Sequence, residues 1–383
     1  MRFSRVVLEN WRNFGQVDVT LQNRAFLVGP NASGKSNFLD VFRFLHDLVV
    51  PGGGFEQAVI SRGGVSSIRN LAARHPSTDV VIEVELENKE ANWRYRIAFN
   101  QDSRQRSRPL LRQERVWRGD EVILDRPDKN DQADGERLRQ THLEQTFANR
   151  DFREIAEFFT TVRYFHLVPQ LVRDPELMLI REDDPYGSDF LEQIAKTARK
   201  TRESRLKRIL EALRVAVPQL IELELKKDER GVPHLRGKYQ HWRPRGAWQT
   251  ESDFSDGTLR LMGLLWALLD DAGSGPLLLE EPELSLHPAV VQRIPQMMLR
   301  VQRSRKRTIR QVFLSTHSSD LLQEGIAADE ILLFVPTEEG SHVEVGAMVD
   351  QVRILLEAGI PPGEVVMPFT QPSEVGQLSF WGD

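Results

Sequence analysis

The chain of 383 residues contains no cysteine, and this absence removes several kinds of chemistry at once. It excludes disulfide bonds, thiolate metal ligands and cysteine nucleophiles, and it agrees with a reducing compartment. The nine histidines are scattered, with no HExxH motif and no close pair. We therefore do not expect a zinc site.

Long apolar runs are also missing. No run approaches the roughly 20 residues that span a bilayer, and the first residues lead into a strand-like pattern without a signal-peptide core. We expect no membrane association and a cytoplasmic location. Hydrophobic residues make up 40% and charged residues 28%, as in ordinary soluble globular proteins. The net charge is −5, so any affinity for nucleic acid must come from local basic clusters.

A glycine-rich loop of the GxxxxGKS type follows the apolar run 25–28 and precedes a helical pattern at 37–48. In this context, backbone N–H groups and a helix N-terminus bind the β- and γ-phosphates of a nucleotide. Lys35 supplies a positive charge, and the hydroxyl of Ser36 can bind Mg²⁺. The loop predicts a nucleoside triphosphate site formed by Gly29, Pro30, Asn31, Ala32, Ser33, Gly34, Lys35 and Ser36.

Two adjacent acids, Glu280 and Glu281, end the apolar run 277–279. At the end of a buried strand, the first carboxylate suits the Mg²⁺ shell, and the second can polarise a water for in-line attack on the γ-phosphate. In isolation the same pattern fits a strand that ends in solvated acids. Beside the phosphate loop, we favour the catalytic interpretation.

Two weaker patterns accompany these motifs. Ser255 stands just ahead of an apolar helical pattern, where its hydroxyl and the following N–H groups can receive a phosphate, although most such residues serve only as helix caps. His317 ends the strand-like run 313–315. It can contact a γ-phosphate or be satisfied structurally.

Taken in order, the motifs resemble the ATP-binding cassette (ABC), and more narrowly the SMC/RecF/OLD-like (AAA_21-like) class of ATPases. The resemblance rests on the opening Leu8-Glu9-Asn10-Trp11-Arg12-Asn13-Phe14, on Asn37 after the Walker A serine, on FSDGT at the signature position (254–258), on LLLEEPE as Walker B (277–283), on SLHP as D-loop (285–288) and on STHS as H-loop (315–318).

This resemblance implies ATP and Mg²⁺ as cofactors, with Ser36 and Glu280 as metal ligands and Glu281 and His317 as catalytic residues. It implies that residues 29–37, Asn37 included, bind the nucleotide in one subunit, and that Ser255 and Gly257 bind it from another. Because one chain holds a single copy of each motif, a complete site needs a dimer, most simply a homodimer. Whether the assembly is larger is left open.

Two positions depart from the family pattern. Glu280 stands where aspartate is usual, and it should still hold a water on Mg²⁺. Asp256 stands where transporters have glycine. The Q-loop has no firm position: Gln57 is one candidate and the segment 62–64 is another.

The expected fold is α/β: an ABC-type P-loop ATPase head with a mixed or parallel core sheet, an antiparallel β lobe and a helical insertion. We assign 1–135 to an N-terminal ATPase lobe, 136–250 to a helical or mixed insertion and 251–383 to a C-terminal ATPase lobe. The patterns also predict an antiparallel meander over 80–125, a loop at 128–135 and helices over 136–160 and 188–217.

The stretch between Ser36 and Phe254 is too short for a long coiled coil and lacks its heptads. Beyond His317 there is no DxD pair and too little chain for a Toprim nuclease domain, so an associated nuclease would be another polypeptide. Two basic clusters fit non-specific DNA, an acidic partner or a solvated face. They are Lys196, Arg199, Lys200, Arg202, Arg205, Lys207, Arg208 and Arg214, and Arg300, Arg303, Arg305, Lys306, Arg307 and Arg310.

The leading hypothesis is an Mg²⁺-dependent ATPase that dimerises around ATP. It would act as sensor or motor subunit in DNA maintenance or anti-phage defence and control a separate effector such as a nuclease. The alternatives are a RecF-like DNA repair loader and an ATP-gated scaffold with little turnover. A transporter ATPase fits least, because the signature is not LSGGQ.

Overall fold

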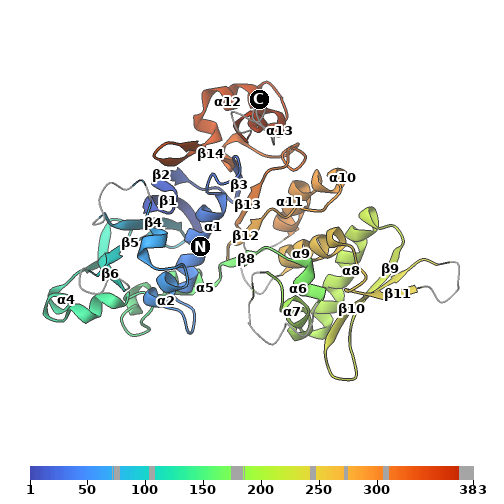
Figure 1. Cartoon of the computed structure of the whole chain (residues 1–383), viewed down its shortest axis with the longest axis horizontal. Coiled ribbons are helices and arrows are strands. Elements are labelled where there is room, and N and C mark those ends of the chain that lie inside the picture. The colour runs from blue at the N-terminus through green and yellow to red at the C-terminus, as the bar shows by residue number, and fades with distance from the viewer. Residues whose placement is uncertain are drawn as a thin grey trace, which may run out of the picture.

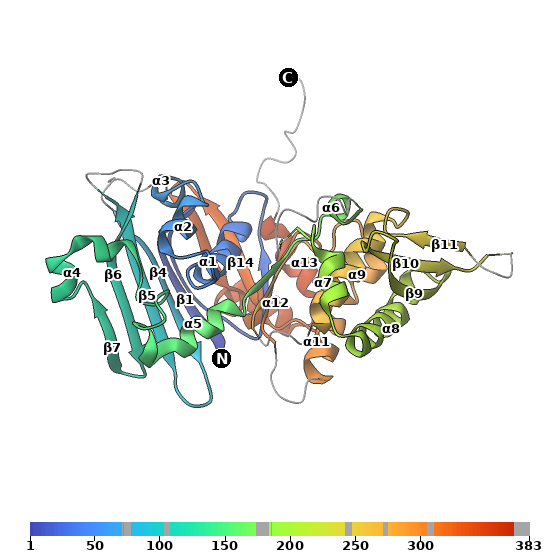
Figure 2. The same ribbon diagram turned by 90° about the horizontal axis from the view of Figure 1, so that it is seen from below.

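The structure is a computed structural model that describes residues 1–70, 72, 78–102, 108–173, 184, 186–241, 247–270, 275–304 and 310–370, with the side chains of 302–304 left aside. Its long axis runs from an N-terminal β-rich part, through a central sheet, to a mixed insertion at the opposite end (Figures 1 and 2). Four members of the second basic cluster, Arg303, Arg305, Lys306 and Arg307, have side chains outside the described part.

The central sheet has the strand order β15-β14-β3-β13-β12-β8. All strands but β15 run parallel, and β15 pairs antiparallel with β14 at the edge. Every residue of β3 and β13 is buried, as expected of parallel strands covered on both faces. The carboxyl ends of β3, β12 and β13 therefore meet at one edge of the sheet. The strands are β3 (Arg24–Val28), β8 (Arg163–Phe165), β12 (Leu277–Glu280), β13 (Val312–Thr316), β14 (Ile331–Thr337) and β15 (Gly340–Val345).

An antiparallel sheet with the order β2-β1-β4-β5-β6-β7 forms the N-terminal end of the molecule. Helix α1 (Lys35–Asp47) lies between this sheet and the central one. The ring of Phe42 on α1 lies 4.8 Å from that of Phe3 in the antiparallel sheet and 4.8 Å from that of Phe313 on β13. One core thus joins both sheets. The strands are β1 (Arg2–Trp11), β2 (Phe14–Thr20), β4 (Val80–Glu87), β5 (Trp93–Gln101), β6 (Pro109–Arg118) and β7 (Glu121–Arg126).

Helix α9 (Asp256–Leu269) connects the central sheet to the insertion. Its Leu264 and Leu268 belong to the core on the second face of the central sheet, and its Leu261 and Leu265 belong to the core of the insertion. The first of these cores also contains residues of α11 (Ile294–Ser304), α12 (Asp350–Glu357) and α13 (Pro362–Val366). The insertion is built from α7 (Phe190–Lys196), α8 (Arg199–Ala216), β9 (Leu220–Lys227), β10 (Pro233–Tyr239) and β11 (Ala247–Thr250).

Short elements complete the described chain. The helices are α2 (Phe55–Ile60), α3 (Val65–Ile68), α4 (Lys129–Ala133), α5 (Arg153–Thr160), α6 (Pro169–Arg173) and α10 (Pro288–Val291), and the 3₁₀ turns are η1 (Gly135–Arg139), η2 (Arg150–Phe152), η4 (Ala328–Glu330), η5 (Gly346–Met348) and η6 (Met367–Thr370). Within the part that the structure describes, no helix combines the length and apolar character needed to cross a bilayer. The predicted α/β fold, with a mostly parallel core sheet and an antiparallel β lobe, is confirmed.

The polar segment 128–135 is not the loop that the sequence predicts, because it contains α4. Asp128 caps this helix, and its Oδ1 accepts a hydrogen bond of 2.8 Å from the N–H of Asp131. The carboxylate of Asp131 in turn accepts two bonds of 2.9 Å from the buried guanidinium of Arg126. The polar residues thus serve as a cap and a buried ion pair, which a polarity pattern does not reveal.

The predicted helical structure over 136–160 is confirmed only in part, because α5 is the one α-helix in this range. The carboxylate of Glu114 accepts hydrogen bonds from the N–H groups of His142 (2.7 Å) and Leu143 (3.0 Å), which replaces helical pairing by bonds to a side chain. Residues of α5 pack in the N-terminal core, and β8 joins the central sheet. The domain boundary at residue 136 stays a prediction.

Candidate active site

The phosphate loop joins the end of β3 to the start of α1. Gly34 has a φ of +98°, a left-handed conformation that glycine adopts at little cost. A Cβ on Gly34 would lie 2.3 Å from Nδ2 of Asn13, and a Cβ on Gly29 would lie 2.5 Å from the carbonyl oxygen of Phe334. Both glycines are therefore required for the close packing of this loop.

Lys35 is folded into the loop, with only 6% of the residue exposed. Its Nζ donates hydrogen bonds of 2.9 Å to the carbonyl oxygens of Gly29 and Pro30. Burial lowers the pKa of Lys35 to about 8, although the nearby carboxylates of Glu281 and Glu280 oppose this shift. The carbonyl oxygens accept the hydrogen bonds that phosphate oxygens would accept from Lys35 in a nucleotide complex.

Glu280, at the end of β12, is held through both carboxylate oxygens. One accepts a hydrogen bond from Oγ of Ser36, and the other accepts one from the hydroxyl of Tyr164 on β8. Burial and the adjacent Glu280 charge raise the pKa of Tyr164, so the phenol remains a donor. The guanidinium carbon of Arg43 lies 4.2 Å from the centre of the Tyr164 ring, and Nδ1 of His166 lies 3.1 Å from the Glu280 carbonyl oxygen.

Glu281 follows in an unusual backbone conformation, with a φ of +42°. A side-chain-bearing residue in this region costs about 1–3 kcal/mol, and such strain is typical of functional sites. One carboxylate oxygen of Glu281 lies 3.3 Å from Nε2 of His317 at the end of β13. Hydrogen bonding to this imidazole lowers the pKa of Glu281, so the side chain is ionised at neutral pH.

Glu283 connects the acidic loop to the segment that carries His317. Its Oε1 accepts a hydrogen bond of 2.6 Å from Oγ1 of Thr316 and one of 3.3 Å from the N–H of His317. Burial raises the pKa of Glu283. Because these bonds hold the backbone of His317, Glu283 contributes to the position of the imidazole relative to Glu281.

Asn13 holds the phosphate loop from the side of the antiparallel sheet. Its Nδ2 donates to the carbonyl oxygen of Ser33 (3.0 Å) and to Oγ of Ser341 on β15 (2.8 Å). Its Oδ1 accepts a hydrogen bond of 2.8 Å from Nδ2 of Asn37. The Asn-Phe opening and the asparagine after Walker A are thus joined to β15 in one network.

The signature residues lie at the start of α9. Ser255 is exposed and caps the helix, with its Oγ accepting a bond of 3.2 Å from the N–H of Thr258. A Cβ on Gly257 would lie 2.4 Å from the carbonyl oxygen of Ser285, so glycine permits the contact with the D-loop. Ser255 therefore has the exposure that a second subunit's nucleotide would require, and a local capping role as well.

The structure brings five predicted residues together at the carboxyl edge of the central sheet. Ser36 contacts Glu280, Glu281 contacts His317, and the charges of both acids act on Lys35. Sequence reasoning missed Tyr164, His166 and Glu283. The third acid of the run 280–283 was a usable signal for Glu283, whereas nothing in a three-residue strand marked Tyr164.

The two Q-loop candidates lie on or beside α2. Gln57 is exposed, and the guanidinium of Arg62 lies 2.8 Å from Asp40 and 2.9 Å from Asp47. Arg62 thus has a structural role in holding α1. A different segment, 164–173, contacts both Glu280 and the signature. Its Tyr164 donates to Glu280, and its Gln170 donates to Asp256 at 3.4 Å.

Several basic residues proposed for DNA are used inside the protein. Arg310 is 3% exposed and donates to the carbonyl oxygens of Gly275 and Ala267, so it is not available to bind phosphate. Arg205 on α8 is buried and lies 3.0 Å from Asp270. The exposed members of the cluster are Lys196, Arg199, Lys200, Lys207, Arg208 and Arg214. Any DNA contact by the 196–214 cluster rests on these exposed members.

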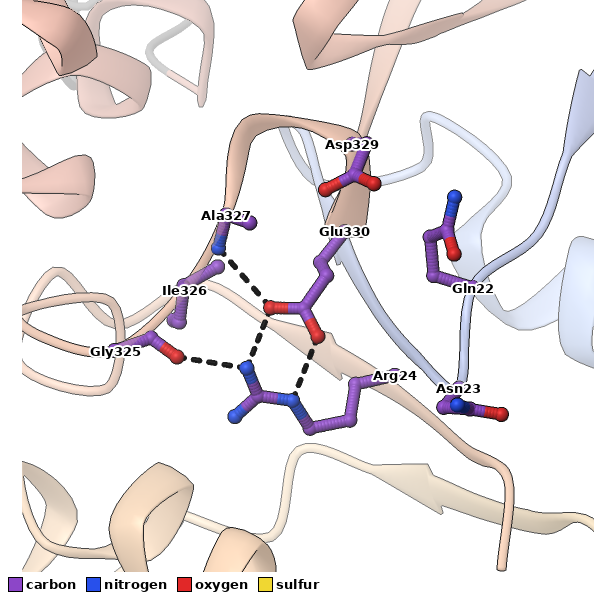
Figure 3. A pocket seen from close by; sticks show the side chains of 8 residues that line it. All are labelled: Gln22, Asn23, Arg24, Gly325, Ile326, Ala327, Asp329 and Glu330. Carbon is purple, nitrogen blue, oxygen red and sulfur yellow. Dashed lines mark hydrogen bonds and ion pairs between the residues drawn. The ribbon is translucent and has the colours of Figure 1, made fainter. Parts of the chain in front are cut away.

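A cavity of about 560 Å³ opens at the amino end of β3, away from the phosphate loop. Figure 3 shows Arg24 donating to the carboxylate of Glu330, with a distance of 2.8 Å from Nε to Oε1, and to the carbonyl oxygen of Gly325. Glu330 also accepts a bond of 3.0 Å from the N–H of Ala327. This buried pair connects β3 to the turn before β14, and we regard it as structural.

Comparisons with known proteins agree with the fold. The AAA_21 family model, described as "AAA domain, putative AbiEii toxin, Type IV TA system", matches residues 24–323. An SMC head bound to the C-winged helix domain of ScpA has a TM-score of 0.55 and 13% identity, and covers 90% of this chain and 97% of its own. The Smc head domain derived from Pyrococcus furiosus, bound to the C-terminal domain of ScpA, has a TM-score of 0.50 and 14% identity, and covers 94% and 99%.

One curated relative matches over a short segment. Endonuclease GajA of Bacillus cereus (strain VD045) is 40% identical over 58 residues, which are 15% of this chain and 10% of that protein. The segment spans far less than two thirds of the relative's length. The match therefore extends to a small part of that protein only.

Proposed function

Because this chain belongs to the AAA_21 family, and with it to the SMC/RecF/OLD-like class of ABC-type ATPases, we propose that it is an Mg²⁺-dependent ATP hydrolase that dimerises around ATP. The observation that carries this proposal is the convergence of Lys35, Ser36, Glu280, Glu281 and His317 at one edge of the central sheet. A phosphate loop, a metal-binding carboxylate and an ionised carboxylate beside a histidine are the groups that phosphoryl transfer to water requires.

The residues present fit Mg²⁺. Oγ of Ser36 and a carboxylate oxygen of Glu280 are in contact, so two hard oxygen donors already point at the same place. Among the described residues, no group of three or more histidine and acidic side chains offers a site made by protein alone. Mg²⁺ bound here would keep waters and phosphate oxygens as further ligands. When bound, Mg²⁺ would neutralise charge on the phosphates.

The roles of the other side chains follow from their contacts. Lys35 would exchange its carbonyl partners for the β- and γ-phosphate oxygens. Glu281 would orient a water in line with the γ-phosphorus and accept its proton as the bond to the ADP oxygen breaks. His317 would hold Glu281 and contact the γ-phosphate. The strained backbone of Glu281 supports a positioned group at this point.

The exposed position of Ser255 supports a composite site. In a dimer of two copies of this chain, the start of α9 in one copy would bind the nucleotide held by the phosphate loop of the other. ATP binding would then close the dimer and hydrolysis would let it open. The output of the cycle would be the assembly state.

The direct test is turnover of ATP by the wild-type chain and by Glu281→Gln and Lys35→Ala, with and without DNA. We expect Glu281→Gln to lower kcat by about 100-fold or more while ATP affinity stays within about twofold, because the neutral amide cannot accept the proton. Lys35→Ala should lose ATP binding. Normal hydrolysis by Glu281→Gln would remove Glu281 from the mechanism.

For the biological role, we propose a sensor or motor subunit that controls a separate effector, with a nuclease as the leading candidate. The short match to an endonuclease and the toxin–antitoxin description of the family support this choice over a RecF-like loader or a scaffold. Tagged protein trapped with ATP in the Glu281→Gln background should co-purify a nuclease encoded nearby. Stimulation of turnover by DNA without such a partner would favour the loader, and negligible turnover would favour the scaffold.

A further inference from the structure

Arg173, the last residue of α6, contacts the signature segment on both sides of Ser255. Its Nη2 donates a hydrogen bond of 2.7 Å to the carbonyl oxygen of Phe254 and one of 2.6 Å to Oδ1 of Asp256. Gln170, one turn earlier, donates to the other carboxylate oxygen of Asp256 at 3.4 Å. The side chain of Arg173 is 24% exposed and that of Asp256 is 39% exposed.

This arrangement restricts the backbone at Ser255. One guanidinium nitrogen bonded to both neighbours of a residue limits rotation about the bonds that lie between them. Ser255 has a φ of −64° and a ψ of 155°, and its side chain already bonds to the N–H of Thr258. With both constraints, the serine and the first N–H groups of α9 are held in one orientation.

The same short segment reaches the catalytic cluster. Tyr164 and His166 contact Glu280, and Arg173 follows a few residues later on α6. Helices α6 and α9 lie side by side (Figures 1 and 2). A single stretch of chain, 164–173, therefore connects Glu280 with the signature segment.

We propose that Arg173 is a positioning residue that holds Ser255 in place for the nucleotide of a second copy of this chain. The proposal rests on the proposed ATP-dependent dimer. It assigns a partner to Asp256, the residue that stands where transporters have glycine: the carboxylate is the anchor for Arg173. Loss of the pair should weaken the closed dimer and leave ATP binding by a single copy unchanged.

The test compares Arg173→Ala, Asp256→Asn and the charge exchange Arg173→Asp with Asp256→Arg, all in the Glu281→Gln background. Affinity for a fluorescent ATP analogue with Mg²⁺ is measured on dilute protein, and ATP-dependent dimerisation by analytical ultracentrifugation. We expect unchanged nucleotide affinity, dimerisation weakened about tenfold or more in each single variant, and recovery to within about threefold in the exchange. Arg115→Ala, which breaks an exposed arginine–aspartate pair of 2.6 Å in the antiparallel sheet, is the matched control and should dimerise normally.

Each contrary result identifies what failed. If Arg173→Ala dimerises with ATP as well as the Glu281→Gln parent does, the proposed role of Arg173 is wrong, but the proposed dimer is not affected. If Arg173→Ala weakens dimerisation but Asp256→Asn does not, and the charge exchange does not restore it, the ion pair is not the cause of the defect. If the parent itself stays monomeric with saturating ATP, the proposed dimer fails, and the inference fails with it. Thermal unfolding of each variant shows whether it is folded. Asp256→Asn is the variant least expected to misfold, because asparagine has the shape of the native aspartate.

Discussion

Glu280 is one methylene longer than the aspartate usual at its position, and the longer side chain reaches a hydrogen-bond donor on the neighbouring strand. Its second carboxylate oxygen accepts a hydrogen bond from Tyr164 on the neighbouring strand, while the first contacts Ser36. The ring of Tyr164 is held in turn by Arg43. The glutamate and the tyrosine therefore act as a pair. We expect Tyr164 to orient the carboxylate that we propose as a ligand of Mg²⁺.

A double-mutant cycle tests this pairing. Tyr164→Phe removes one hydrogen bond to a charged group, so the Mg²⁺ concentration at half-maximal turnover should rise about tenfold. ATP affinity without metal should not change. In a Glu280→Asp background, whose shorter side chain no longer reaches the phenol, the same substitution should have less than about a twofold effect. Equal effects of Tyr164→Phe in both backgrounds would show that the tyrosine acts in another way.

The lowered pKa of Lys35 leads us to expect that ATP affinity depends on pH. Burial lowers its pKa to about 8 in the free protein, whereas phosphate favours the charged form. ATP binding should therefore take up a proton above about pH 8, and the dissociation constant should rise by up to tenfold for each further unit. Titration with a fluorescent ATP analogue from about pH 7 to pH 9.5 measures this.

The control for this prediction is Lys35→Arg, because a guanidinium does not titrate in that range. Its ATP affinity should be flat with pH, whatever its absolute value. A sloping profile in both proteins would assign the proton to another group. The sign for stability follows as well: the folded pKa lies below the unfolded value, so the contribution of Lys35 to the free energy of unfolding rises between about pH 8 and pH 10.5.

Among the elements, α4 depends on a buried charge cluster. The guanidinium of Arg126 lies 2.9 Å from Asp131 on α4 and 2.9 Å from Glu114 on β6, and all three side chains are fully buried. Arg126→Ala would leave the buried Glu114 without its cation and Asp131 with only Arg137, 3.1 Å away, so we expect a loss of about 3–5 kcal/mol in the free energy of unfolding. The matched control is Arg115→Ala, which breaks a surface pair with Asp125.

Chemical denaturation of the two variants measures the difference. The exposed pair should contribute less than about 1 kcal/mol. Similar midpoints for Arg126→Ala and the wild type would mean that water enters the cluster and solvates the acids. Turnover of ATP should survive in Arg115→Ala, because its pair lies in the antiparallel sheet.

Elements with strong local signals were predictable from the sequence. The strand, glycine loop and helix around 25–48 combine a buried run, turn residues and helical spacing, and β12 and β13 are short buried runs beside them. β8 has only three residues, which is too few for a pattern, and it is a strand because it pairs with β12. Tyr164 could not be found for the same reason, since its role depends on that pairing.

At the scale of the whole molecule, the candidate active site is assembled from distant parts of the chain. The phosphate loop comes from the first tenth, Tyr164 from the middle, and Glu280 and His317 from the last third. The insertion lies between Tyr164 and Glu280 in sequence and carries β11 near the far end of the molecule (Figure 2). Helix α9, which contributes residues to two hydrophobic cores, joins the insertion to the site.

This arrangement makes a prediction about subunits that no single chain can test. Lys35→Ala disables the phosphate loop, and Ser255→Arg places a large cation where a second copy's nucleotide would bind. Each variant alone should be inactive. In an equal mixture, half of the dimers pair the two variants, and each of these has one site with a native loop and a native signature. Turnover should therefore recover to about a quarter of the wild-type value, if the two sites act independently. A mixture no more active than its parents would mean that both sites must work together or that Ser255 serves its own subunit, and full activity of Ser255→Arg alone would remove the signature from the site.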